Sequence, residues 1–282
     1  MQVIRDLPRL KEEIEKLKIM QQSIGLVPTM GFLHEGHLSL IREARRSDDV
    51  VVVSIFVNPI QFGEGEDYED YPRDLEGDSN KAEKEGVDIL FCPRVSDMYP
   101  RGYATYVEVE RLTEGLCGSG RPGHFRGVTT VVNKLFNLVE PERAYFGQKD
   151  AQQALVIRKM AGDLNMNLEV KVSPTVREED GLALSSRNSY LSSEERRAAR
   201  VLYRALSEAS DLVYHRQEYR PEVVQRYMEE VVEKEPLANL EYAEVVSGED
   251  LSPLSEIRGK ILLALAVKIG STRLIDNMML EV

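Results

Sequence analysis

The sequence predicts an α/β protein, with a Rossmann-like parallel sheet in its N-terminal part and a smaller α+β module in its C-terminal part. Short apolar strands alternate with amphipathic helices up to about residue 187, which is typical of a parallel sheet covered on both faces. Beyond that point the strands lie beside Gly248, Pro253 and Gly270, which favours antiparallel strands. We therefore expect two domains, residues 1–184 and 185–282, the second with a three-stranded antiparallel sheet.

The N-terminal elements follow from the spacing of apolar residues. Leu7, Leu10, Ile14 and Leu17 recur at helical intervals and predict a first helix over residues 4–20. Short β-branched or apolar runs predict strands, and the amphipathic stretches between them predict helices. We expect strands at 23–28, 50–57, 87–91, 144–146 and 168–172, and helices at 37–46, 74–85, 127–139 and 151–164.

The C-terminal elements have a different pattern of charged and apolar residues from the N-terminal ones. Long charged stretches with an apolar face predict two helices, and three later segments have little helical periodicity and flank turn residues. The expected helices span 193–213 and 221–233, and the expected strands span 241–246, 261–269 and 273–282.

Composition excludes several classes of protein. The chain of 282 residues carries 36 Lys and Arg against 48 Asp and Glu, a net charge of −12, which disfavours nucleic-acid binding. No apolar stretch approaches the ~20 residues that cross a bilayer. The first residues are charged throughout and lack the apolar core of a signal peptide, so we expect a cytoplasmic protein. Cys92 and Cys117 form no Cys-x-x-Cys motif, and we expect both thiols to be reduced and structural.

The loop after the first long strand, residues 28–37, holds two of the four histidines. His34 and His37 are three positions apart at a predicted helix start, where backbone amides and the helix dipole attract anions. Two imidazoles there can donate hydrogen bonds to phosphate oxygens, and Gly36 allows close approach of the backbone. A zinc site is disfavoured, because the metalloprotease motif is His-Glu-x-x-His and this is His-Glu-Gly-His. A purely structural capping role for both rings stays open.

Polar residues follow two further strands. Asn58 and Gln61 come after the second long strand, and their amides could fix an oriented polar ligand. Lys149 and Gln153 come after the strand near residue 145. Because ligands of parallel sheets bind outside the carboxyl ends of the strands, we expect these side chains to face one site.

Three other segments are weaker candidates. Ser185, Ser186 and Arg187 lie at the domain boundary and suit a triphosphate, although a cap or turn is equally consistent with them. The acidic stretch 64–78 is typical of a solvated face, but Asp78 could bind Mg²⁺ through water. Arg121 lies within a formal G-x-G-x-x-G at 118–123, which we reject as a dinucleotide site because no strand leads directly into it. No Walker P-loop occurs.

Six blocks of this sequence, in this order, resemble the pantoate–β-alanine ligase family of the nucleotidylyltransferase superfamily. The first is similar to the superfamily's His-x-Gly-His nucleotide motif, and SSRN stands in the place of its second, Lys-Met-Ser-Lys-Ser-like motif. The blocks are PTMGFLHEGHLSL, FVNPIQFG, YPRD, RPGHFRGV, YFGQKDAQQ and VREEDGLALSSRNSYLS. The resemblance covers nearly the whole chain, with the C-terminal third matching in layout more than in motifs.

The resemblance implies a two-step reaction that uses ATP and Mg²⁺. ATP and pantoate give pantoyl adenylate and pyrophosphate, and β-alanine then displaces AMP to give pantothenate. The resemblance also implies a Rossmann-like fold, a homodimer, and a C-terminal domain that closes over ATP.

It further implies roles for individual residues. The phosphate group comprises His34, His37, Lys149, Ser185, Ser186 and Arg187. Pantoate is assigned to Gln61 and Gln153, with Asn58 and Arg121 as further substrate residues. The nucleotide group comprises Gly147, Gln148, Asp150, Val176 and Leu184, together with Pro28, Thr29 and Met30, which also lie beside pantoate. The family has Met at the position of Leu184, a change of similar volume. Asp78 is the candidate Mg²⁺ ligand.

Three alternatives remain at this point. Another nucleotidylyltransferase would need more basic residues for a second phosphate and no amine site. A class I aminoacyl-tRNA synthetase shares both motif types, but a chain of charge −12 and this length lacks the room and the charge for tRNA. A non-catalytic nucleotide sensor would bind nucleotide without pyrophosphate exchange.

Overall fold

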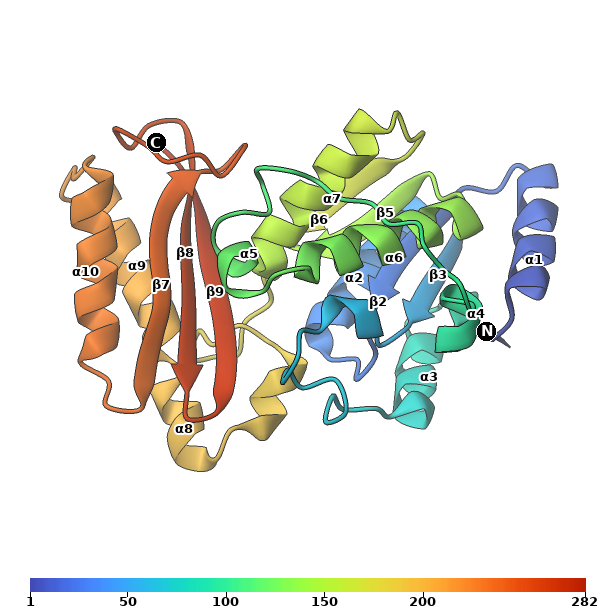
Figure 1. The fold of residues 1–282 in the computed structure, drawn as a ribbon, viewed down its shortest axis with the longest axis horizontal. Helices are drawn as coiled ribbons and strands as arrows, with labels where there is room; N and C mark the ends of the chain where they lie inside the picture. Colours follow the sequence, from blue (N-terminus) through green and yellow to red (C-terminus); the bar gives the residue numbers. More distant parts are fainter.

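The computed structural model describes residues 1–282, which fold around two separate sheets (Figure 1). The N-terminal sheet has six parallel strands in the order β1-β4-β3-β2-β5-β6, and the C-terminal sheet has three antiparallel strands in the order β7-β8-β9. The predicted fold class is therefore confirmed. The strands are β1 Gln2–Ile4, β2 Ile24–Thr29, β3 Val50–Ile55, β4 Ile89–Phe91, β5 Arg143–Gly147, β6 Glu169–Ser173, β7 Ala238–Ser247, β8 Lys260–Ile269 and β9 Thr272–Glu281.

Helices cover both faces of the parallel sheet. Val50 and Val52 of β3 point to the core shared with α1, α6 and α7, whereas Val51 and Val53 point to the core shared with α2 and α3, as strand alternation requires. The helices are α1 Leu7–Ile19, α2 Glu35–Ser47, α3 Leu75–Lys84, α4 Val95–Met98, α5 Cys117–Gly120, α6 His124–Val139, α7 Ala151–Asp163, α8 Ser193–Ala198, α9 Val201–Tyr214 and α10 Pro221–Glu233, with 3₁₀ turns η1 Pro59–Gln61, η2 Gln148–Asp150 and η3 Ser186–Tyr190.

The direction of the chain reverses at β2. From β2 it runs outward through β3 to β4, and it then returns to place β5 on the other side of β2, where Leu26 pairs with Ala144. In an open parallel sheet this switch point is where the loops diverge and leave a crevice beyond the strand ends. The segments that begin at Met30 and at Gln148 therefore start side by side.

The C-terminal sheet has two different faces. One face packs against α9 and α10 and forms a second apolar core. The other face, which includes Leu262 and Ala264, packs with Leu116 and Ala151 of the N-terminal part. Figure 1 shows the small sheet standing beside the end of the large one. The space between the two parts is therefore walled on one side by β8 and β9.

Two predicted elements differ from the sequence-based expectation, and the short helices α4 and α5 have no predicted counterpart. The first helix begins at Leu7 rather than at Ile4, because the Asp6 carboxylate caps it by accepting from the Arg9 amide at 3.0 Å, and Ile4 instead lies in β1. A strand of three residues is too short to show its own periodicity. The helix predicted over 193–213 is divided at Ala199 and Arg200 into α8 and α9. The exact division at residues 184 and 185 stays a prediction, and Leu182 already packs in the second core.

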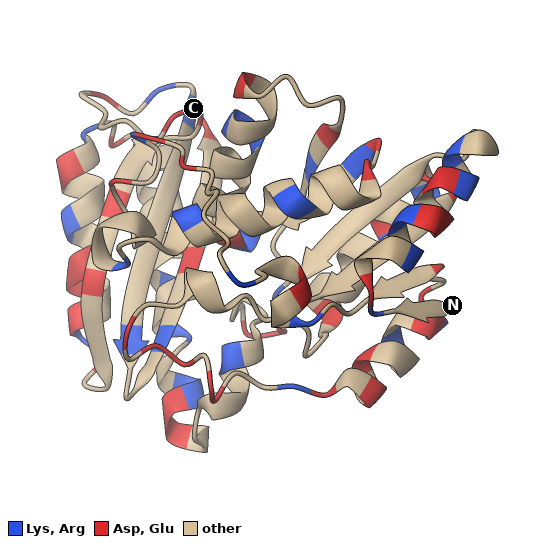
Figure 2. Ribbon diagram, turned by 45° about the vertical axis from the view of Figure 1, so that its right-hand side comes forward, with Lys and Arg blue, Asp and Glu red and all other residues tan.

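Charged residues of both signs are interspersed along the helices, whereas the strands are largely free of them (Figure 2). This distribution agrees with a core built from the sheet faces. None of the helices combines the length and the apolar character needed to span a bilayer.

Candidate active site

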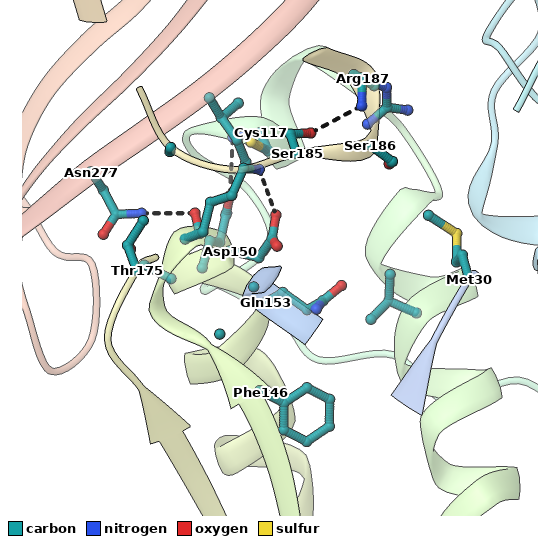
Figure 3. Close-up of a pocket in the computed structure, with 18 of the residues that line it drawn as sticks. Met30, Cys117, Phe146, Asp150, Gln153, Thr175, Ser185, Ser186, Arg187 and Asn277 are labelled. Atoms are coloured by element: carbon teal, nitrogen blue, oxygen red, sulfur yellow. Dashed lines mark hydrogen bonds and ion pairs between the residues drawn. The ribbon is translucent and has the colours of Figure 1, made fainter. Parts of the chain in front are cut away.

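One cleft lies at the switch point and is shared by the two parts of the chain (Figure 3). Its walls come from the loops after β2, β3 and β5, the turn 174–188, and β9. The sequence-predicted residues that line it are Pro28, Thr29, Met30, His34, His37, Gln61, Arg121, Gly147, Lys149, Asp150, Gln153, Val176, Leu184, Ser185, Ser186 and Arg187. Asn58, Asp78 and Gln148 do not line it, and each has a different place in the structure.

The two histidines both cap a helix and face the cleft. His34 is the N-cap of α2, and its Nδ1 accepts from the Gly36 amide at 3.2 Å. Nδ1 of His37 accepts from the His34 amide at 3.3 Å, which completes a capping box. The ring centroids are 4.1 Å apart. The structural role and the ligand-facing role, which the sequence presents as alternatives, are therefore compatible.

These caps fix the protonation of both rings. A ring nitrogen that accepts from an amide carries no proton, so the proton of each neutral imidazole lies on Nε2. Burial lowers the pKa of His34 to about 4, with a smaller effect from Lys149. Burial also lowers the pKa of His37 well below its ordinary value, and His34 adds to this. At neutral pH the cleft therefore contains two neutral imidazoles, each able to donate one Nε2–H bond.

Asn58 holds Gln61 in place and does not line the cleft, so its direct contact with substrate stays a prediction. Asn58 is buried, its Nδ2 donates to Gln61 Oε1 and to the carbonyl of Gly127, both at 3.0 Å, and its Oδ1 accepts from Tyr99 at 2.8 Å. All its hydrogen-bonding capacity toward the cleft is thus used within the chain. Asn58 positions Gln61, and Gln61 reaches the cleft.

Gly127 allows helix α6 to lie close to the backbone of η1. A Cβ atom at Gly127 would lie 2.5 Å from the carbonyl oxygen of Ile60 and 2.6 Å from Cα of Gln61. These are backbone atoms, so they cannot rotate away as a flexible side chain would. Only glycine allows α6 to lie this close to η1.

Lys149 and Gln153 extend from the segment that follows β5. Nζ of Lys149 lies 3.8 Å from Asp150 Oδ1, and the side chain is 19% exposed. Gln153, in the first turn of α7, makes no hydrogen bond within the chain and points into the cleft (Figure 3). An unpaired amide and a cation therefore line the cleft on the segment next to the histidine loop.

Gln148 turns away from the cleft, so its assignment to the nucleotide stays a prediction that the cleft lining does not support. Its Nε2 donates to Asn277 Oδ1 of β9 at 3.1 Å. Successive residues of the η2 turn point in different directions, and the side chain of Lys149 is the one that enters the cleft. Gln148 instead joins the two parts of the chain.

Arg121 lines the cleft, but its charge is already paired. Its Nε donates to Glu66 at 2.7 Å, and Nη1 lies 3.0 Å from His124 Nε2. Nδ1 of His124 lies 2.7 Å from the carbonyl oxygen of Gln61, which can only accept, so the proton of this ring is on Nδ1. Burial, with help from Arg121, lowers the pKa of His124 to about 4. This network supports the backbone of Gln61.

The Ser185–Arg187 segment is also partnered. Arg187 forms a bidentate pair with Asp67, with Nε and Nη2 at 2.9 and 2.7 Å from the carboxylate oxygens. The Ser186 hydroxyl lies 3.0 Å from the Tyr71 hydroxyl, and Ser185 Oγ accepts from the Arg187 amide (Figure 3). The 62–73 loop is therefore fastened to this segment, and a phosphate that binds Arg187 has to compete with Asp67.

Asp78 is an anchor for the histidine loop and does not fit the role of a Mg²⁺ ligand. Its two oxygens accept from the amides of Phe32 and Leu33 at 2.7 and 2.6 Å, and the residue is 1% exposed. No cluster of three or more His, Cys, Asp and Glu side chains suited to a resident metal is present. In the cleft, Asp276 is paired with Arg177, whereas the Asp150 side chain is 47% exposed. Asp150 therefore fits a Mg²⁺ ion that arrives with a triphosphate, because Mg²⁺ binds through one or two carboxylates plus phosphates.

Sequence reasoning missed several lining residues. The Thr175 hydroxyl is buried without a hydrogen-bond partner in the chain. Tyr242, Arg273 and Asn277 come from the C-terminal strands. A detectable signal existed for only one of them, since Asn277 belongs to an Asp-Asn pair that interrupts the apolar stretch 274–280 of β9. Buried polar side chains of this kind usually form a hydrogen bond with a specific partner.

Comparison with known proteins gives a consistent result. A sequence model of the Pantoate-beta-alanine ligase family matches residues 2–279. A pantothenate synthetase of Acetivibrio thermocellus is 56% identical over 282 residues, which covers 100% of both chains. The crystal structure of pantothenate synthetase from Thermus thermophilus superposes with a TM-score of 0.94 at 48% identity and covers 99% of each chain. A Francisella tularensis pantoate-beta-alanine ligase, complexed with beta-gamma ATP and beta-alanine, superposes with a TM-score of 0.82 at 36% identity, covering 99% of this chain and 97% of the other.

Proposed function

The chain belongs to the pantoate–β-alanine ligase family, whose reaction forms pantothenate, and from that premise we propose how its own residues divide the work. We propose that ATP and pantoate first react to pantoyl adenylate and pyrophosphate, and that β-alanine then displaces AMP. This proposal rests on one observation. Two neutral imidazoles, one lysine and one unpaired amide line the same cleft at the switch point.

In the first step, a carboxylate oxygen of pantoate attacks the α-phosphorus. The bond from that phosphorus to the bridging oxygen breaks, and the electron pair leaves with pyrophosphate. Nε2–H of His34 and His37 donates to the phosphate oxygens on which charge increases, and Lys149 supplies a full positive charge from the neighbouring η2 turn. No protein nucleophile is required.

Pantoate is assigned to the two glutamines. Gln61 is fixed by Asn58, and Gln153 has its full hydrogen-bonding capacity free. Their amides present both donors and acceptors, which match the hydroxyl and carboxylate groups of pantoate. Such a pair of glutamines orients the carboxylate toward the α-phosphorus.

The nucleotide is assigned to the segment after β5 and to the 174–184 turn. Gly147, Asp150, Val176 and Leu184 line this side of the cleft, and the unpaired Thr175 hydroxyl is a further polar group available to the nucleotide. Mg²⁺, when bound with ATP, offsets phosphate charge. Asp150 is the carboxylate that fits it, for the reason given above.

In the second step, the amine of β-alanine attacks the acyl carbon, the bond to the AMP oxygen breaks, and AMP leaves. We propose that residues 185–282 act as a lid that keeps water from the acyl adenylate, because the Ser185–Arg187 segment and β9 belong to this part and line the cleft. We also propose a homodimer in the cytoplasm, on the basis of family membership. Sedimentation equilibrium would test the dimer.

ATP–pyrophosphate exchange tests this function directly. We expect exchange that requires pantoate and Mg²⁺ and proceeds without β-alanine, because the adenylate forms before the amine reacts. Exchange that appears only when all three substrates are present would contradict the adenylate route. Exchange supported equally by unrelated small carboxylic acids would contradict the assignment of pantoate.

A further inference from the structure

We propose that Asn277 is a positioning residue, which holds Lys149 in its productive place from across the boundary between the two parts of the chain. The inference rests on the proposed role of Lys149 in the departure of pyrophosphate. Asn277 lies on β9, whereas Lys149 lies in the η2 turn after β5. Asn277 lines the cleft, but its amide is used on the η2 backbone, so we assign its contribution to that backbone.

The amide of Asn277 is fully used on this turn. Its Nδ2 donates to the carbonyl oxygens of Gln148 and Lys149 at 3.0 and 2.8 Å, and its Oδ1 accepts from Gln148 Nε2 at 3.1 Å (Figure 3). Asn277 is 5% exposed. Only a carboxamide can donate to two carbonyl oxygens and accept from an amide at the same time. Any other side chain leaves buried polar groups unpaired.

The position of Asn277 is itself fixed. The neighbouring Asp276 forms a bidentate pair with Arg177, at 2.6 and 2.9 Å, and Nη2 of Arg177 also donates to the carbonyl of Asn277 at 3.2 Å. The Arg177 guanidinium lies 4.6 Å from the ring centre of Tyr203. The Asn277 amide is therefore a rigid support and not a mobile surface group.

The η2 turn needs such support. It has only three residues, and no side chain caps its start at Gly147. Its first carbonyls are held by Asn277, so the direction in which the Lys149 side chain leaves the turn depends on these bonds. A displacement of about 1 Å at a reacting centre can cost about 10²-fold in rate. The loss should appear only in the step that uses Lys149.

The test compares Asn277→Leu, which has the same shape without the polar groups, with Leu280→Ala on the same strand. Leu280 packs in the C-terminal core, on the face of β9 opposite to Asn277, so it reports general weakening of β9. Both variants are assayed well below their melting temperatures, for pantoate-dependent pyrophosphate exchange and for the reaction of β-alanine with preformed pantoyl adenylate. A third assay measures Lys149→Ala alone and combined with Asn277→Leu.

We expect Asn277→Leu to lower the kcat of exchange by about 10- to 100-fold and to change the reaction of the preformed adenylate by less than about threefold. Leu280→Ala should change the two half-reactions to the same extent. The double variant should be no slower than Lys149→Ala, because both changes remove the same contribution. Should Asn277→Leu fail to fold, Gln148→Ala, which removes only the bond to Oδ1, should give a smaller loss confined to exchange.

Equal loss in both half-reactions, or a double variant slowed by the product of the single effects, would overturn the inference. If Lys149→Ala abolishes exchange but Asn277→Leu does not lower it, the role of Asn277 fails while the proposed function stands. If Lys149→Ala leaves exchange intact, the proposed role of Lys149 fails, and the route through Asn277 fails with it.

Discussion

The two walls of the cleft are prepared for their ligands to different degrees. On the histidine wall, the rings of His34 and His37 are neutral, their tautomers are set by the caps of α2, and Nε2 of each is available. On the Ser185–Arg187 wall, Arg187 and Ser186 are bonded to Asp67 and Tyr71 of the 62–73 loop. The first wall can act without rearrangement, whereas the second has to exchange partners. We therefore expect the first wall to govern kcat and the second to govern the binding of ATP.

The largest effect is expected from His34→Asn and His37→Asn. The Asn carboxamide keeps an acceptor near the position of Nδ1 and so retains the cap, but it cannot reach the place of Nε2. Loss of one such donor should lower the kcat of pyrophosphate exchange by about 10²- to 10³-fold, with the melting temperature nearly unchanged. The matched alanine variants should lose both the activity and about 1 kcal/mol of stability from the cap. Full exchange activity in the Asn variants would reduce both histidines to structural caps.

The next effect concerns Gln61 and Gln153. Each alanine variant should raise the pantoate KM by about 5- to 150-fold, the equivalent of about 1–3 kcal/mol for an unmatched polar partner, and leave the ATP KM within about twofold. Asn58→Ala should act in the same direction but more weakly, because it frees Gln61 without removing it. Initial-rate kinetics in both substrates decide the point. An equal rise in both KM values would contradict the assignment.

A smaller effect of opposite sign is expected at the second wall. Asp67→Asn removes the charge that competes with phosphate for Arg187, so the ATP KM should fall. The two side chains are only 28% and 25% exposed, but the Asn carboxamide keeps a hydrogen bond to Arg187, so the net gain for phosphate should be about 1 kcal/mol, or about fivefold. Asp70→Asn, on the same loop and without a charged partner, is the control. A higher ATP KM in Asp67→Asn would mean that Asp67 holds Arg187 ready and does not obstruct it.

The smallest effect is expected from pH. Since burial lowers the pKa of His34 to about 4 and that of His37 well below its ordinary value, kcat at saturating Mg²⁺ and ATP should stay nearly flat between about pH 5.5 and 8. An inflection near pH 6.5 that disappears in His34→Asn would show that an imidazolium acts instead.

Protein stability should depend on pH in the same region. The pKa values of His34, His37 and His124 in the folded chain all lie below the unfolded value near 6.5. The unfolded chain therefore binds more protons in acid, so their contribution is complete above about pH 6.5 and is lost as the pH falls toward 4. Thermal melts across this range, with and without His124→Asn, would measure it.

The sequence predicted the parts of the site that depend on local order. His34, His37, Lys149 and Gln153 follow strands that meet at the switch point, and a strand-end position was enough to bring them together. Asn58 and Gln148 do not line the cleft, because a strand-end position does not say which way a side chain turns. The predicted Mg²⁺ role does not fit Asp78, because its two oxygens accept hydrogen bonds from backbone amides 45 and 46 positions earlier in the chain. Asn277 was missed because the Asp-Asn pair in β9 does not say which segment it bonds, since that depends on how the small sheet docks onto the large one.

The close approach of α6 to η1 has a consequence for variation at this site. Gly127 contacts no substrate, yet any larger residue there would push the backbone of Ile60 and Gln61 upward and make the pantoate pocket shallower. In a library that samples every codon at this position under selection for growth without the vitamin, glycine alone should survive. The lack of a side chain at Gly127 thus determines how large an acid the enzyme accepts.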